Sequence, residues 1–151
     1  MTPEENLASL GITLPPVATP IANYVPSVRT GNLLFVSGNG PSDDLPNRAG
    51  KLGADLTVEQ GYAVARDVGI KLIASIQDAV GDLSRVKRIV KLLGMVNSAP
   101  DFADQPAVIN GCSDLLVAVF GDAGKHARSA VGMGALPGDI AVEIELIAEV
   151  E

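Results

Sequence analysis

The stretch from Arg128 to Glu151 constrains the fold most, because two runs of alternating residues flank Leu136-Pro137-Gly138-Asp139. Alternation of apolar and polar residues with a period of two is the pattern of a strand with one buried face. Proline in the second position and glycine in the third are typical of a type II turn, in which glycine takes the positive φ. The sequence therefore predicts two C-terminal strands joined by this turn.

Direct pairing of these two strands across the turn fixes which side chains share a face. The resulting pairs are Gly132 with Glu143, Ala130 with Glu145, and Arg128 with Ile147. One face then holds the core residues Val131, Met133, Val142, Ile144 and Leu146. The other face holds an arginine, several small residues and two carboxylates. Two interpretations remain open for it: a ligand site, or cross-strand ion pairs on an exposed sheet.

The rest of the chain alternates between strand and helix patterns. Residues 1–11 predict a short helix capped by Thr2, and strands over 24–29 and 32–36 form a hairpin. A capping box at Thr57 starts a long amphipathic helix that ends near Gly81, an apolar strand covers 86–96, and a second helix starts near Pro106 and stops around Gly121.

These elements give the order β-β-α-β-α-β-β in one domain spanning residues 1–151. We expect an α+β fold in which two helices cover one face of a mixed, mostly antiparallel sheet. Residues 1–21 form an N-terminal extension that packs on the surface, and its segment Pro15-Pro16…Pro20 should run extended.

Composition excludes several classes of function. Hydrophobic residues make up 47% of the 151 residues and charged residues only 19%, so we expect part of the sheet to be buried against other copies. The net charge is −7, with three Phe, two Tyr and no Trp, which disfavours binding to nucleic acid. The densest basic cluster, at positions 85, 87, 88 and 91, is better explained as the solvent side of a strand.

The single cysteine and single histidine exclude an internal disulfide and a zinc site of the usual ligand set. Cys112 lies on an apolar helix stripe and predicts a core residue, whereas His126, beside Lys125, predicts a solvated side chain. The N-terminus has no signal-peptide core and no apolar run is long enough to cross a bilayer. We therefore expect a cytoplasmic protein that does not contact a membrane.

Two segments carry a resemblance to a known family. NYVPSVRTGNLLFVSGNGP, which begins at Asn23, and ARSAVGMGALPGDIAVEIELIA, which begins at Ala127, are similar to the Rid family (YjgF-type, reactive-intermediate imine deaminases). The resemblance covers nearly the whole chain from about Tyr24. It implies a chorismate-mutase-like fold and a homotrimer with clefts between subunits, and it requires neither metal nor organic cofactor.

The resemblance also implies roles for individual residues. Arg128 matches the carboxylate-binding arginine and Glu143 the water-positioning glutamate of the family. The remaining matches in the pocket are Tyr24, Ser37, Asn110 and, through its backbone, Ala130. Ala130 stands where imine deaminases commonly have cysteine, and Asn39-Gly40 stand where a longer side chain is usual, so the shape of the pocket should differ.

The activity implied by the resemblance is hydrolysis of small 2-imino acids to 2-oxo acids and ammonia. A guanidinium holds a carboxylate through two parallel hydrogen bonds, and a positioned carboxylate can activate water. The alternative is a trimer of the same family that binds a small carboxylate without turnover. An endoribonuclease or translation inhibitor, as relatives are often labelled, is less compatible with the acidic charge and the few aromatic residues.

Overall fold

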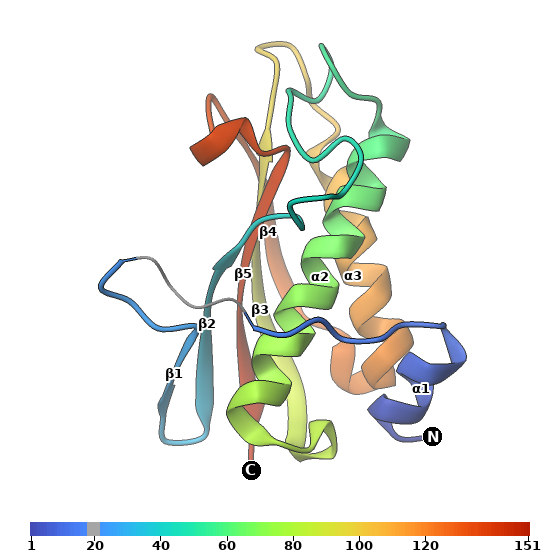
Figure 1. Cartoon of the computed structure of the whole chain (residues 1–151), viewed down its shortest axis with the longest axis vertical. Helices are drawn as coiled ribbons and strands as arrows, with labels where there is room; N and C mark the ends of the chain where they lie inside the picture. Colours follow the sequence, from blue (N-terminus) through green and yellow to red (C-terminus); the bar gives the residue numbers. More distant parts are fainter. Residues whose placement is uncertain (18–21) are drawn as a thin grey trace.

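The computed structural model of the chain describes residues 1–17 and 22–151. Its helices cover one face of a five-stranded sheet, and both termini lie near the same end (Figure 1). The helices are α1 (Pro3–Ser9), α2 (Val58–Val80) and α3 (Gln105–Phe120), and the strands are β1 (Ser27–Thr30), β2 (Leu33–Asn39), β3 (Val86–Asn97), β4 (Ala127–Met133) and β5 (Val142–Val150). Short 3-10 turns span Leu83–Arg85 (η1), Gly121–Gly124 (η2) and Pro137–Asp139 (η3). The α+β class and the order of elements are confirmed.

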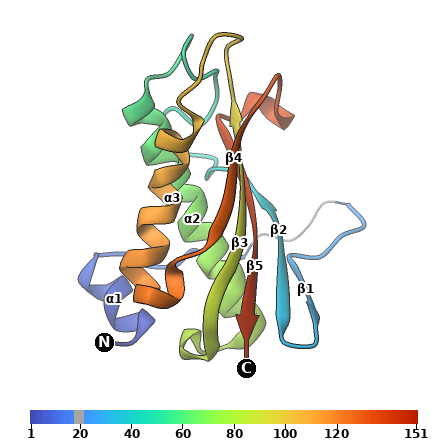
Figure 2. The same ribbon diagram turned by 180° about the vertical axis from the view of Figure 1, so that it is seen from behind.

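The strands are arranged in the order β1-β2-β5-β3-β4, so β5 is the central strand. It pairs antiparallel with β2 and β3, whereas β3 and β4 are parallel (Figure 2). The predicted direct pairing of the last two strands is therefore wrong, because β3 lies between them.

The turn itself is present, but the segment around it leads the chain away from β4. Asp139 N donates to Leu136 O at 3.0 Å, and Gly138 has the positive φ of +65°. Beyond the turn, Ala141 N donates to Arg48 O at 2.8 Å and Asn97 N donates to Ala141 O at 2.9 Å. These bonds place the start of β5 against the end of β3. Turn chemistry alone could not reveal this, because the partners come from distant parts of the sequence.

In the observed register, the side chains of β4 lie on the opposite faces of the sheet from those predicted. Leu92 of β3 pairs with both Arg128 and Leu146, and because Leu92 is fully buried, Arg128 lies on the helix-covered face. Met95 pairs with both Val131 and Glu143, which places these two on the opposite, open face. Val131 and Met133 are thus not core residues, and Val131 is 38% exposed. The prediction holds for Val142, Ile144 and Leu146, which are buried.

The helical layer is closely packed. Both predicted N-caps form capping boxes, Thr2 with Glu5 at α1 and Thr57 with Gln60 at α2. A Cβ added at Gly111 of α3 would overlap with a backbone carbonyl of α2, so glycine permits the two helix backbones to approach. The short α1 lies on α3, where Asn6 Nδ2 donates to Val119 O at 2.8 Å.

The N-terminal extension continues from α1 along the helical layer (Figure 1). Leu7 is buried in the main core, with Ile12 and Leu14 partly buried against it. Of the predicted extended proline segment, Pro20 lies outside the described residues.

Helix α3 belongs to the core. The prediction that no apolar run is long enough to cross a bilayer is wrong by length and composition alone, because the segment Gln105–Gly124 meets both criteria; half of it is buried inside the domain. Its fully buried residues include Val108, Ile109, Cys112, Leu116 and Val119, which pack in the same core as α2 and the sheet. Its apolar character is therefore explained by packing within the domain.

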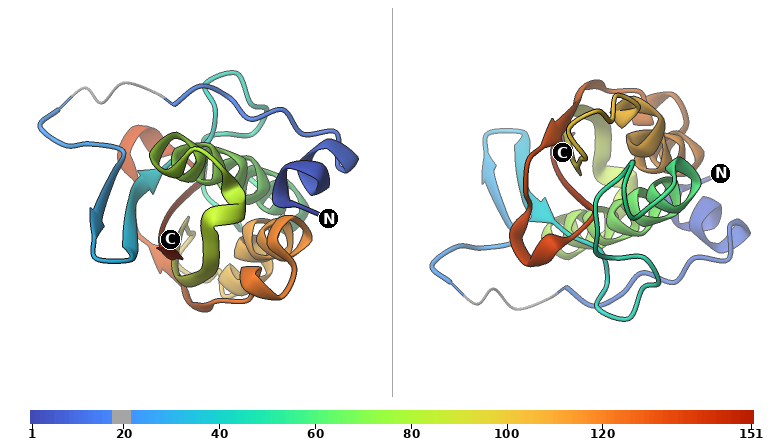
Figure 3. Two further views of the ribbon diagram at one scale, coloured as in Figure 1. Left: turned by 90° about the horizontal axis from the view of Figure 1, so that it is seen from below. Right: turned by 90° about the horizontal axis from the view of Figure 1, so that it is seen from above.

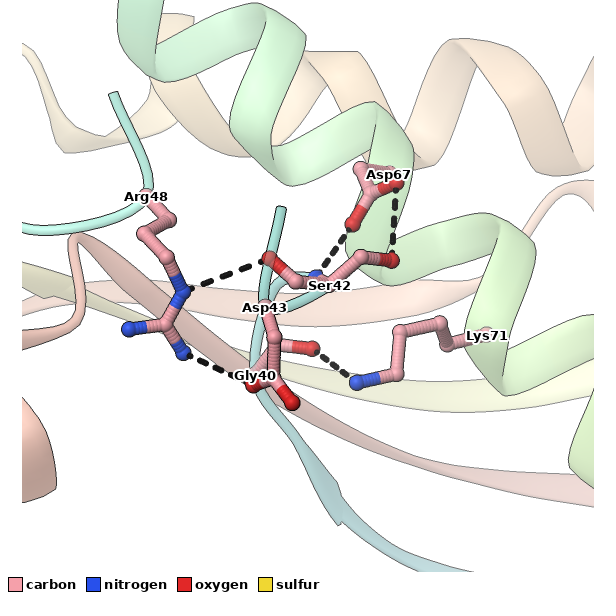
Figure 4. A network of polar contacts seen from close by, with 6 residues as sticks. All are labelled: Gly40, Ser42, Asp43, Arg48, Asp67 and Lys71. Carbon is pink, nitrogen blue, oxygen red and sulfur yellow. Dashed lines mark hydrogen bonds and ion pairs between the residues drawn. The ribbon is translucent and has the colours of Figure 1, made fainter. Parts of the chain in front are cut away.

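The loop between β2 and α2 is attached to α2 by a polar network (Figure 4). Asp67 accepts hydrogen bonds from Ser42 N at 2.8 Å and from Ser42 Oγ at 3.3 Å. Lys71 Nζ donates to Gly40 O at 2.8 Å, and Arg48 Nε donates to Ser42 O at 3.3 Å. Two residues of α2 thus fix the path of the chain just after β2, next to one half of the site described below.

The face of the sheet opposite the helices is uncovered (Figure 3). Large apolar side chains are exposed on it, with Val28 at 56%, Phe35 at 42%, Val131 at 38% and Leu33 at 37%. The register places them with Ile147 of β5 on the same face. Part of the apolar surplus of the sequence is thus exposed on one side of the fold.

Candidate functional site

Arg128 is held by neutral partners from α3. Its Nη1 donates to Asn110 Oδ1 at 2.8 Å and to Ser113 Oγ at 3.1 Å. Both hydrogens of Nη1 are used, while Nε and Nη2 have no partner among the described residues. In residues 1–17 and 22–151 the ion pairs are Arg48–Asp43 and Lys125–Asp122, so the interpretation of Arg128 as part of a cross-strand ion pair is wrong. A half-buried guanidinium without a counter-ion is suited to binding an anion.

His126 forms part of the same group of residues, contrary to the predicted solvated side chain. Its Nε2 lies 2.9 Å from Ser113 Oγ and its Nδ1 lies 2.7 Å from Gly124 O. Ser113 therefore joins the imidazole to the guanidinium. Sequence analysis did not single out Ser113. The available signal was its position three residues after Asn110, which places both side chains on one face of the helix.

Glu143 lies on the open face of the sheet, beside β2. A Cβ added at Gly38 would be 2.7 Å from Glu143 Oε2, so the missing side chain of Gly38 makes room for this carboxylate. Burial and, to a lesser degree, the negative charge of Glu145 raise the pKa of the Glu143 carboxyl above its ordinary value. Glu145 is on the same face but exposed. A carboxyl group with a raised pKa is a common feature of general acid–base catalysts.

Tyr24 and Ser37 lie together at the edge of β2. They line a cavity of about 80 Å³ with Asn39, Lys71 and Ser75. The Ser37 hydroxyl donates to Val25 O at 2.7 Å, which holds the chain before β1 against the end of β2. Gly38 also lines this cavity, so Tyr24 and Ser37 border the segment that contacts Glu143.

The predicted site residues thus fall into two groups within one chain. The first group lies at edge strand β4 and α3 and contains Arg128, Asn110 and Ala130. The second group lies at β2 and β5 and contains Glu143, Tyr24 and Ser37. Arg128 and Glu143 project from opposite faces of the sheet, with β3 between their strands. The predicted arrangement of both on one sheet face is wrong for a single chain.

Cys112 takes no part in the polar group, although it lies close to it. The thiol is fully buried, and burial raises its pKa to about 12, while the charge of Arg128 acts in the opposite direction. A thiol of this kind is inert, so the prediction of Cys112 as a core residue is confirmed. Among the described residues, no cluster of three or more His, Cys, Asp or Glu side chains could hold a metal ion.

A five-stranded mixed sheet with two long helices on one face is consistent with the YjgF/chorismate-mutase-like class of small domains. Residues 4–150 match the model of the family described as "YjgF/chorismate mutase-like, putative endoribonuclease". The chain belongs to this family.

Similar proteins support the assignment. Protein TCP17 of Trypanosoma cruzi is 49% identical over 146 residues, which cover 95% of this chain and 91% of that protein. The crystal structure of Atu1372, a protein of unknown function from Agrobacterium tumefaciens, is 42% identical with a TM-score of 0.91, covering 99% of this chain and 92% of that one. Escherichia coli TdcF, solved with bound serine, is 26% identical with a TM-score of 0.60, covering 91% and 94%.

Proposed function

We propose that this protein hydrolyses small 2-imino acids to 2-oxo acids and ammonia, at a site assembled between copies of the chain. The observation that carries the proposal is the unpaired guanidinium of Arg128, whose Nη1 is held by neutral groups. Nε and Nη2 of the guanidinium remain available to donate hydrogen bonds to a ligand. This edge of the guanidinium matches the two oxygens of a carboxylate.

Glu143 is the group best placed to activate water. Its raised pKa keeps the carboxyl closer to neutrality than an exposed glutamate, so it can both accept and return a proton. In the proposed reaction Glu143 takes a proton from water as the oxygen attacks the imino carbon. It gives this proton to the imino nitrogen, which yields the carbinolamine, and then moves the hydroxyl proton to the same nitrogen, so that the C–N bond breaks, the carbonyl forms and ammonia leaves. No redox partner is needed.

Assembly would unite the two groups of residues. Arg128 lies in β4, an edge strand of the sheet, and Glu143 lies on the uncovered apolar face. We infer a homotrimer in which the open face is buried and Arg128 of one copy approaches Glu143, Tyr24 and Ser37 of the next. The exposed apolar residues of that face support this arrangement, since such a patch usually marks an interface.

The binding of a small amino acid by a relative supports the class of ligand. TdcF was solved with serine, which has the carboxylate and the two-position nitrogen of a 2-imino acid. The same observation supports the alternative function, in which the site retains a small carboxylate without turnover.

The experiment measures trapping of the imine. A pyridoxal-phosphate dehydratase generates 2-iminobutanoate in the presence of semicarbazide, and the semicarbazone is followed by absorbance. Wild-type protein should reduce the trapped fraction, and Arg128→Ala, with its fold checked by circular dichroism, should not. Equal effects of both proteins, or no effect of wild type, would refute hydrolysis. Binding of 2-oxobutanoate without any effect on trapping would favour the binding protein.

A further inference from the structure

We propose that Ser113 and His126 are positioning residues that fix the orientation of the Arg128 guanidinium for its carboxylate ligand. The inference rests on the proposed function, because it concerns the same arginine. It adds two side chains that do not themselves touch the substrate. Ser113 comes from α3, and His126 lies between η2 and β4.

The direction of each hydrogen bond follows from the chemistry of the groups. Gly124 O can only accept, so the neutral imidazole carries its hydrogen on Nδ1. His126 Nε2 must then accept the hydrogen of the Ser113 hydroxyl. With its hydrogen directed at the imidazole, Ser113 Oγ presents lone pairs to Arg128 Nη1. The backbone carbonyl thus sets the tautomer of the ring, and the ring sets the orientation of the hydroxyl.

This series of hydrogen bonds determines which edge of the Arg128 guanidinium faces outward. Asn110 and Ser113 take the two hydrogens of Nη1 and prevent rotation of the planar group about its long axis. Nε and Nη2 are then presented side by side. Without Ser113, one Nη1 hydrogen loses its acceptor, and the guanidinium gains alternative orientations in which a bidentate pair is not aligned.

The backbone at Gly124, whose carbonyl holds His126, is tightly packed. Gly124 is buried at the end of η2, and a Cβ there would overlap with the carbonyl of Leu116 on α3. The carbonyl that holds His126 is therefore fixed relative to the same helix that carries Asn110 and Ser113. The geometry links one helix, one turn and one edge strand at the guanidinium.

The ring can be observed directly because His126 is the only histidine in the sequence. Long-range ¹H–¹⁵N correlation spectra of the protein labelled at histidine report the tautomer without an assignment step. We expect the Nδ1–H tautomer in the neutral form, in wild type and in Ser113→Ala. A predominant Nε2–H tautomer would overturn the inference, since the Ser113 hydroxyl could then no longer donate to the ring.

The functional arm uses pyruvate, a stable 2-oxo acid, titrated against the full chain. Ser113→Ala should raise the Kd for pyruvate and the KM for the imine by about tenfold. Ser113→Thr, which keeps the hydroxyl, should restore both to within about threefold. The matched control is Ser84→Ala, at an exposed serine in η1, which should leave both unchanged.

The outcomes separate this inference from the proposed function. Wild-type turnover with an unchanged Kd and KM in Ser113→Ala overturns the positioning role alone. Pyruvate binding that weakens in Ser113→Ala, without turnover by wild type, supports the positioning role and refutes hydrolysis. Absence of both binding and turnover in wild type overturns both.

Discussion

Mixing two inactive variants would show whether the site is shared between copies of the chain. Arg128 projects from the helix-covered face of the sheet and Glu143 from the open face, so one chain cannot bring them together without unfolding its sheet. Arg128→Ala and Glu143→Gln should therefore each be inactive alone, below about 1% of wild type, since each removes a different half of every site.

Equal mixing followed by reassembly gives a defined recovery. In a cyclic trimer each interface combines one copy's Arg128 with the next copy's Glu143. An intact site requires that the arginine comes from a Glu143→Gln chain and the glutamate from an Arg128→Ala chain. In random assembly, each of the two chains that form a site is the required variant with a chance of about one half. About a quarter of the sites should therefore be intact.

The assay is the semicarbazide competition described above, carried out after both variants are unfolded in urea and refolded together. The control mixes Arg128→Ala with a variant that carries both substitutions, which can restore no site. Recovery no greater than in this control, with trimers confirmed by light scattering and with exchange of chains confirmed by mass spectrometry, would refute a site shared between copies.

Three further predictions concern the chain itself. Glu143→Gln should raise the melting temperature at pH 7 but not at pH 4. The raised pKa of the Glu143 carboxyl lowers the stability of the folded protein at pH values where the group is ionised. This loss of stability disappears as the pH falls below the pKa of the carboxyl in the unfolded chain. Cys112 should not react with a maleimide in native protein and should react in urea, because the thiol is buried with a pKa of about 12. Gly111→Ala should lower the free energy of unfolding by about 1–3 kcal/mol in urea titration, whereas Gly134→Ala, whose Cβ would meet nothing within 4 Å, should be nearly neutral. A stabilised Gly111→Ala would mean that helix propensity outweighs the contact between the two helices.

Local sequence patterns predicted the elements of this fold accurately. The capping residues Thr2 and Thr57 start the helices that they were predicted to start, and Gly81 and Gly121 end α2 and α3. These signals are reliable because each depends on hydrogen bonds or backbone angles within a few residues.

The pairing of the strands could not be predicted as well, because it depends on residues far apart in sequence. The alternation in β4 and β5 correctly predicted two strands, and the Pro137-Gly138 turn correctly predicted a reversal. The sequence could not show that Arg48 and Asn97 hold the start of β5 beside β3. A different partner strand changed the face on which Arg128 lies, although its strand was correctly predicted.

The polar group around Arg128 shows a second limit of sequence analysis. His126 looked solvated because its neighbour Lys125 is charged and exposed, yet the turn before β4 brings the ring to Ser113. The family resemblance implied roles for Asn110 and Arg128 but none for Ser113 and His126. Residues that support another side chain leave little signal in a single sequence, since serine and histidine are common at surfaces as well.

The separation of Arg128 and Glu143 has a chemical advantage that the predicted hairpin lacked. Had β4 and β5 paired directly, the guanidinium would have faced the same side as two carboxylates, and an ion pair with one of them would have occupied the donors needed for a ligand. In the observed fold Asn110 and Ser113 satisfy part of the guanidinium without neutralising it. The positive charge therefore stays available for an anion, and within the chain the pKa of Glu143 stays raised because the carboxyl is partly buried and the charge of Glu145 acts on it. At the proposed site between copies, an arginine and an acid held on different surfaces of one chain would face the substrate from two sides instead of forming a direct ion pair within that chain.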